Sequence, residues 1–331
     1  MKKIFKSLTL TAILFAAVSC SKAPINTPKE DKGGNDPIAT ERKCATMEVL
    51  AANIKENPEI LSRMKAIEEQ TNRFINRAVD GKSTEGVPFT GTVNIPVKVH
   101  VIYNTAQQNI SDAQIQSQID VLNKDYTATN ADVNNTPSIF TSSVSNFDIH
   151  FTLSSVDRKQ SSKTSWGTRD AMKKSKQGGV DPVDPAHYLN IWVCNIGGGI
   201  LGYAQFPGGS AATDGVVIGP QYFGNTGYVA APYDKGRTAT HEIGHWLNLR
   251  HIWGDANCGD DLVSDTPQHN AANYGCPAYP HLSTCAGTPV EMTMNYMDYT
   301  DDPCMYMFSN GQKTRTRAIF ASDGARSSFV Q

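Results

Sequence analysis

The sequence predicts an α+β fold, in which a mixed twisted sheet with helices packed on it precedes a loop-rich segment that contains four cysteines. The first observation is the order of patterns, which runs strand, helix, three strands and then a histidine-rich helix. The second is residues 241 to 254, HEIGHWLNLRHIWG, where that helix has to end early. The third is a group of four cysteines beyond residue 254, in a stretch rich in Gly, Pro, Asp and Asn.

The individual elements follow from apolar spacing and end signals. Between Thr46 and about Ile75, apolar residues recur at helical spacing, and Asn57-Pro58 divides this stretch into two short helices. Ser111 is expected to cap the helix that follows the first strand. The expected strands are 93–103, 147–156, 188–196 and 214–220, and a last helix is expected at 312–321.

One glycine pattern matches the short motif of dinucleotide-binding sites. Gly197, Gly199 and Gly202 match G-x-G-x-x-G directly after a strand. A dinucleotide-binding fold needs a helix to open there and an acidic residue about 20 positions later. The stretch instead ends in Pro-Gly-Gly at residue 209, so we interpret it as a Gly-rich loop. Cys194, inside the preceding strand, is most simply a small core residue.

The histidine-rich helix carries the pattern H-E-x-x-H. His241 and His245 are four residues apart, so both imidazoles project from one helix face, with Glu242 beside them. Zinc binds neutral imidazole, a catalytic zinc keeps one position open for water, and a neighbouring carboxylate can take the proton of that water. An amphipathic helix with two surface histidines is the alternative interpretation, because H-E-x-x-H alone also occurs by chance.

A third zinc ligand requires the helix to stop. In an unbroken helix, His251 would be turned by about 600° from His245 and would face away. Asn248 stands where the helix must end, and Asn tolerates the left-handed conformation of a helix C-cap. The sequence therefore predicts a zinc site formed by His241, His245 and His251.

The N-terminus predicts export. Lys2, Lys3 and Lys6 precede an apolar run that ends in AVSC, which indicates a lipoprotein signal at 1–20 with Cys20 as the lipidated residue. An ordinary signal peptide cut near Ser19 is the alternative, and either route permits disulfides. A formal net charge of −2 and the lack of a basic cluster argue against nucleic acid as a partner. Any membrane contact would be made through the lipid.

Residues 21–80 are expected to form a tether and a pro-segment, and 81–331 the catalytic domain. Residues 21–40 are polar and contain three prolines and two glycines, as in a flexible linker. Cys44 then precedes the two short helices. It is either a spare thiol or a thiolate that blocks the open zinc position in a precursor, since thiolate binds zinc better than water does.

The segment after the zinc motif holds two further candidate features. Four cysteines in an exported loop region indicate two disulfides with three possible pairings, and zinc binding by them is disfavoured because they form no C-x-x-C pair. Four oxygen-bearing residues crowd the same loop and suit calcium, with solvated loop carboxylates as the alternative. The cysteines are Cys258, Cys276, Cys285 and Cys304, and the calcium candidates are Asp260, Asp261, Asp265 and Thr266.

The combination of H-E-x-x-H-x-x-N-x-x-H and N-Y-M-D-Y at 295–299 resembles the metzincin zinc metalloproteases, and most closely their pappalysin family. The likeness covers roughly residues 90 to 325 and includes YLNIWVCNI, GGGILGYAQFPG and MNYMDYTDDPCM. The chain departs from most metzincins at Asn248, where they have Gly, but an Asn C-cap can serve the same purpose.

The resemblance implies a metzincin-type fold, with the mixed twisted sheet and helices above the cleft and a loop-rich, disulfide-bonded lower part. It also implies roles for further residues. Met297 would be the methionine of the Met-turn beneath the zinc, and the hydroxyl of Tyr299 would approach the zinc and stabilise the oxyanion. Cys44 would provide cysteine-switch latency. Members of the family tend to cleave before Arg with an acidic pocket, for which Asp302 is the candidate base. The implied disulfides are Cys258–Cys285 and Cys276–Cys304, and calcium after the zinc site is a family feature.

These features predict an exported or lipid-anchored zinc endopeptidase that is made as a latent zymogen and acts on peptides or proteins. Zinc would activate a water, and Glu242 would take its proton and pass it to the leaving amine. Strand 214–220 is expected to line the cleft and pair with extended substrate. The alternatives are a non-catalytic zinc-containing surface lipoprotein that binds a ligand, and an unrelated zinc hydrolase. A cut before Arg73 or Arg77 would separate the catalytic domain from both the lipid on Cys20 and the blocking thiolate of Cys44.

Overall fold

The computed structural model describes residues 38–80 and 89–330 of the chain. The predicted signal region with Cys20 and most of the tether at 21–40 lie outside these residues. None of the helices in the described part is long and apolar enough to cross a membrane.

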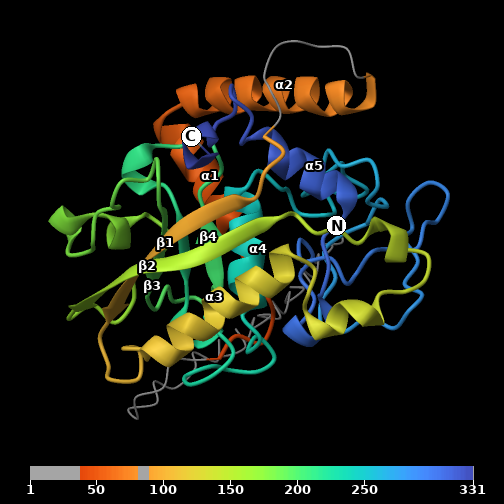
Figure 1. The fold of residues 1–331 in the computed structure, drawn as a ribbon. Helices are drawn as coiled ribbons and strands as arrows, with labels where there is room; N and C mark the ends of the chain where they lie inside the picture. The colour runs from red at the N-terminus through yellow and green to blue at the C-terminus, as the bar shows by residue number, and fades with distance from the viewer. Residues whose placement is uncertain (1–37, 81–88, 331) are drawn as a thin grey trace, which may run out of the picture. The chain divides into compact units, whose positions relative to one another are not determined.

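A five-stranded mixed sheet organises the fold (Figure 1). Its strands are β1 (Val93–Tyr103), β2 (Ile149–Gln160), β3 (Leu189–Val193), β4 (Gly202–Ala204) and β5 (Val216–Ile218). Their order across the sheet is β2-β1-β3-β5-β4, in which all neighbours are parallel except the antiparallel pair β4 and β5. The predicted mixed sheet is thus confirmed.

The cleft-lining strand was predicted wrongly. β5, which corresponds to the expected strand 214–220, is bonded on both sides, to β3 and β4, so it cannot pair with a substrate. The edge is β4, which lies inside the stretch interpreted as a Gly-rich loop. A strand of three residues that begins with Gly202 has no alternating pattern of its own, and its pairing with β5 creates it.

Each face of the sheet is covered by helices or loops. On one face, buried side chains of β1 such as Val97 and Val99 belong to one core with residues of α3 (Asp112–Tyr126) and α4 (Arg237–Trp246). The two helices are joined by a hydrogen bond from the Tyr126 hydroxyl to the Thr240 carbonyl, 3.0 Å. On the other face, Trp192 forms a second core that includes Val49 from the N-terminal helices.

The N-terminal helices are α1 (Thr46–Glu56) and α2 (Glu59–Asp80), so the predicted break at Asn57-Pro58 is confirmed. α2 lies beside α5 (Asn310–Ala318), the predicted last helix, as Figure 1 shows. Arg315 donates two hydrogen bonds to the Glu68 carboxylate, at 2.8 and 2.5 Å. The predicted pro-segment is therefore packed on the body of the fold rather than detached from it.

Candidate metal centre and active-site cleft

The α4 helix presents the first two histidines and then stops. All its residues are buried, and His241 and His245 face the same side. The helix ends because Asn248 adopts a left-handed backbone with φ of 74°, as the capping argument predicts. The amide of Leu249 then donates to the Gly244 carbonyl at 2.9 Å, which closes the helix end. The chain turns back and brings His251 to the same place.

The three histidines converge on one point. Nε2 of His245 lies 3.2 Å from Nε2 of His241 and 3.1 Å from Nε2 of His251. Each Nδ1 has an acceptor of its own: the Tyr296 carbonyl for His241 at 2.7 Å, the Leu249 carbonyl for His245 at 2.8 Å, and the Asp255 carboxylate for His251 at 2.6 Å. Each Nδ1 can therefore carry the proton, which leaves three Nε2 lone pairs directed together.

This donor set fits zinc. Burial and the neighbouring histidines hold the pKa of His241 and His245 well below its usual range, which favours the neutral, ligating form. Three neutral imidazoles with their second nitrogens anchored are the ligands expected of a catalytic zinc site. Within the described part of the chain, these histidines and Cys44 are the one group of His, Cys, Asp or Glu able to hold a metal ion.

Cys44 lies in residues 42–46, which lead into α1 and are called the N-terminal segment below. Its sulfur lies within 4.8 Å of the histidine ligand atoms. The segment is held along the edge strand, because the Ala45 amide donates to the Gly202 carbonyl at 3.0 Å and the Leu201 amide donates to the Lys43 carbonyl at 2.9 Å. Cys44 and Gly202 form a parallel bridge. The N-terminal segment thus occupies the free edge of β4 and the metal centre together.

Glu242 is also in contact with the N-terminal segment. The Thr46 hydroxyl donates to Oε2 of Glu242 at 2.9 Å and accepts from the Ala204 amide at 2.8 Å. The Cys44 thiol donates to the same carboxylate oxygen at 3.3 Å. Burial raises the pKa of Glu242 to about 7. Thr46 was not predicted from the sequence, because its partners Glu242 and Ala204 lie 196 and 158 residues away.

Met297 and Tyr299 lie beside the histidines. A Cβ added to Gly244 would lie 2.4 Å from the Met297 sulfur, so this glycine permits the methionine to pack directly against α4. The Tyr299 ring contacts His241 and His251, with centroids 5.7 and 4.9 Å apart. Its hydroxyl donates to the Cys44 carbonyl at 3.3 Å. Both residues thus lie next to the three histidines, and their roles in catalysis stay a prediction.

A buried arginine of the N-terminal segment, Arg42, lies close to the metal centre and acts electrostatically on His241 and Glu242. Nη2 of Arg42 lies 2.5 Å from Oδ1 of Asp302, and both side chains are inaccessible to solvent. Nε of Arg42 donates to the Thr300 carbonyl at 3.0 Å, and Nη1 donates to the Thr238 hydroxyl at 3.3 Å. The guanidinium also lies over the Tyr233 ring, 5.0 Å from its centroid. Asp302 is the residue predicted from the resemblance, whereas no signal in the sequence near Arg42 indicates this contact.

The four calcium candidates are used in different ways. The Asp265 carboxylate accepts from the Ser309 hydroxyl and the Gly311 amide at the start of α5. The Asp261 carboxylate accepts from the Thr266 hydroxyl, at 2.9 and 3.0 Å, and Asp260 accepts from the Leu262 amide. Asp261 is buried, and burial raises its pKa to about 7. The Asp265 carboxylate is therefore bonded to the start of α5, whereas the Asp261 carboxylate is bonded to Thr266.

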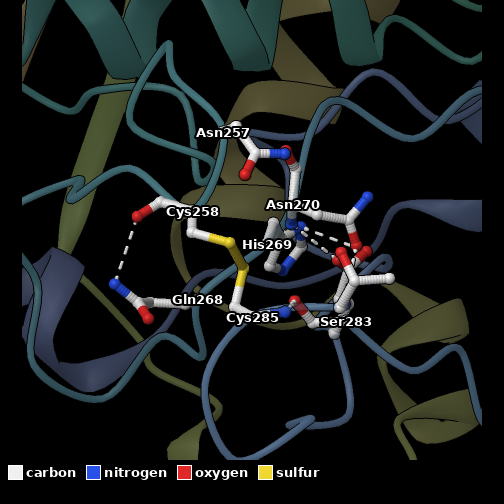
Figure 2. Close-up of a disulfide and its surroundings, with 9 residues drawn as sticks. Asn257, Cys258, Gln268, His269, Asn270, Ser283 and Cys285 are labelled. Carbon is white, nitrogen blue, oxygen red and sulfur yellow. Dashed lines mark hydrogen bonds and ion pairs between the residues drawn. A yellow bond between two sulfur atoms is a disulfide. The ribbon is translucent and has the colours of Figure 1, made fainter.

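Both disulfides have the pairing that the resemblance implies, Cys258–Cys285 and Cys276–Cys304. Figure 2 shows the first of them next to Gln268, whose amide donates to the Cys258 carbonyl at 3.2 Å. The other two cysteines of the described part, Cys44 and Cys194, are unpaired, and Cys194 is buried in the core as expected. The disulfides join loops that have little regular structure of their own.

The fold and this site define a zinc metalloendopeptidase of the metzincin type. A family model described as pregnancy-associated plasma protein-A matches residues 173–321. Extracellular metalloprotease 1 of Coccidioides posadasii is 33% identical over 241 residues, which cover 69% of this chain and 77% of the relative.

Two solved structures from Tannerella forsythia are also similar. Mature mirolysin in complex with a cleaved peptide is 46% identical, with a TM-score of 0.71, over 73% of this chain and 96% of the other. A promirolysin mutant is 41% identical, with a TM-score of 0.78, over 87% and 97%. The chain therefore belongs to the pregnancy-associated plasma protein-A, or pappalysin, family, and it has the structure of a zymogen.

Proposed function

We propose that this metalloendopeptidase is exported, kept latent by its residues 42–46, and directed to peptide bonds that precede arginine. His241, His245 and His251 would hold the zinc, and the convergence of their Nε2 atoms is the observation that carries the proposal. Zinc bound there supplies Lewis-acid chemistry, in which a water becomes more acidic and the scissile carbonyl is polarised.

Glu242 would act as the general base. Its carboxylate is at the metal centre, next to Cys44. A pKa of about 7 suits a group that takes a proton from water and later gives it to the leaving amine near neutral pH. The Tyr299 hydroxyl, freed from the Cys44 carbonyl when the N-terminal segment leaves, would donate to the developing oxyanion. Met297 would serve as the apolar support of the metal site.

The contacts of Arg42 support the preference for arginine. Three of its nitrogens have acceptors within the pocket, and its charge is paired with Asp302. A buried carboxylate that lost this partner would be costly, so the emptied pocket favours another cation of the same shape. We infer that Arg42 occupies the pocket of the substrate arginine that follows the scissile bond.

Latency would come from the same segment. Cys44 would take the position needed by water, and the backbone of residues 43–45 covers the β4 edge that we propose for extended substrate. Residues 21–80 would thus be the tether and pro-segment, and 81–331 the catalytic domain. A cut before Arg73 or Arg77 would separate the domain from a lipid on Cys20. Arg73 lies in α2 with its side chain half exposed, so this helix would have to unwind locally before cleavage.

Calcium is proposed for the loop that contains Asp261 and Thr266. A buried carboxylate whose pKa is raised, and which forms no ion pair in the described structure, is suited to a bound cation. Asp260 and Asp265 would contribute through the loop backbone, since their carboxylates cap local amides.

Metal removal tests the proposed function directly. Activated enzyme treated with a zinc chelator should lose peptide hydrolysis, and stoichiometric zinc should restore it. Hydrolysis that persists after zinc has been shown by elemental analysis to be absent would contradict the proposal. An enzyme anchored to membranes with an intact N-terminus and full activity would contradict the release step.

A further inference from the structure

The three candidate zinc ligands differ in what holds their second nitrogen. Nδ1 of His241 and Nδ1 of His245 each face a backbone carbonyl, whereas Nδ1 of His251 faces the carboxylate of Asp255 at 2.6 Å. Asp255 was not among the residues that the sequence pointed to. It is four positions after His251 and outside the helix, so only the turn of the loop brings the two together.

The loop is shaped to make this contact. Gly254 and Asp255 have φ of 61° and 56°, the left-handed region in which Gly and Asp are better tolerated than most residues. A Cβ at Gly254 would lie 2.3 Å from the Asp260 amide nitrogen, so only glycine fits. On its other side, His251 is stacked on Trp253 with a centroid distance of 4.3 Å and an interplanar angle of 9°. The imidazole is therefore held both by a ring face and by a carboxylate.

We propose that Asp255 is a positioning residue for the zinc, which acts through His251; the inference rests on the zinc site of the proposed function. A hydrogen bond from Nδ1–H to a carboxylate fixes the tautomer with Nε2 free, and the negative charge makes that nitrogen a stronger donor to a cation. A backbone carbonyl fixes the tautomer as well but adds no net charge. Among the three histidines, His251 would thus be the one whose affinity for zinc depends on a neighbouring side chain, that of Asp255.

A purely structural role for Asp255, as a tie within the loop, makes a different prediction. Such a tie would stabilise the zinc-free protein, whereas a positioning role appears in zinc affinity and in the electronic spectrum of a metal at the site. Asp157 provides a matched control, because its carboxylate faces Nδ1 of a buried histidine, His100, at 3.1 Å on strands β1 and β2.

The test uses the full chain carrying Glu242→Gln, so that self-cleavage does not interfere. Asp255→Asn keeps an oxygen that can accept from Nδ1 but removes the charge, Asp255→Ala removes both, and Asp157→Asn is the control. Zinc dissociation constants are measured by competition with a chelator, cobalt-substituted protein is examined by visible absorption, and the melting temperature of the zinc-free protein is recorded.

Asp255→Ala should weaken zinc binding by about 10- to 100-fold and Asp255→Asn by about tenfold, with an altered cobalt spectrum. Asp157→Asn should leave both measurements unchanged. Wild-type affinity and spectrum in Asp255→Asn would overturn the inference. So would a loss of affinity explained by a lower melting temperature of the zinc-free variant. Failure of the parent chain to bind zinc would instead overturn the metal centre itself.

Discussion

Thr46 should contribute to latency independently of Cys44, and the Thr46→Val substitution tests this. The Thr46 hydroxyl is fully buried and makes two hydrogen bonds, one to the Glu242 carboxylate and one from the Ala204 amide. Valine has nearly the same shape but removes both bonds. The backbone amide of Ala204 is then buried without this partner in the closed form, whereas it meets water or substrate when the segment opens.

The magnitude follows from these two contacts. A hydrogen bond to a charged group contributes about 1.5–3 kcal/mol, and a buried amide without a partner costs about 1–3 kcal/mol. Together they should destabilise the closed form by roughly 2.5–6 kcal/mol, which is about a 10²- to 10⁴-fold shift towards the open form. Thr46→Ser keeps the hydroxyl and should stay close to wild type.

The assay is the initial rate of hydrolysis of a fluorogenic arginine peptide by the uncleaved chain. Intact mass is followed at each time point, and rates are extrapolated to zero time so that processed enzyme does not contribute. Basal hydrolysis should be far higher in Thr46→Val than in Thr46→Ser. Equal basal rates in the two variants, with both chains intact and folded, would show that the Thr46 hydroxyl does not stabilise the closed form.

Three further predictions concern Asp302 in the proposed arginine pocket, Cys44 at the metal centre and Asp261 in the proposed calcium loop. Asp302→Asn should lower kcat/KM for arginine peptides by about 10- to 100-fold while zinc content is retained, and an unchanged kcat/KM would contradict the pocket assignment. Cys44→Ala should raise basal activity of the intact chain by less than Cys44→Ala combined with Thr46→Val; equal activities would show that Thr46 adds nothing. Asp261 has its folded-state pKa raised to about 7 from about 4, so in calcium-free protein its stabilising contribution is present below about pH 4 and is lost as the pH rises through about 7. Thermal melts from pH 4 to 8 should show this loss, and either calcium or Asp261→Asn should reduce it; identical melting curves would argue against a role for Asp261.

The metal centre was predictable because local geometry dictates it. The spacing of four positions from His241 to His245 fixes their common helix face, and the left-handed Asn248 follows from the need to bring His251 back. The strand β1 and the helix break at Asn57-Pro58 were predictable for the same reason, since their signals lie within a few neighbouring residues.

The rest depends on contacts between distant parts of the chain. Arg42 reaches Asp302 across 260 positions, and nothing near either residue indicates the pairing. β4 is too short and too rich in glycine to be recognised as a strand, so the cleft edge was assigned to β5 instead. Asp255 reaches His251 only because Gly254 and Asp255 are left-handed, which the spacing alone does not reveal.

We propose that Glu242 and zinc held by the three histidines hydrolyse peptide bonds before arginine. To test this directly, wild type and Glu242→Gln, both without the signal region, are incubated with a set of arginine-containing peptides. Mass spectrometry then identifies the cut sites and the N-terminus of each protein. Cuts before arginine, and processing of its own N-terminal segment, in wild type alone are the predicted result. Cleavage by zinc-loaded Glu242→Gln at the wild-type rate would contradict the account.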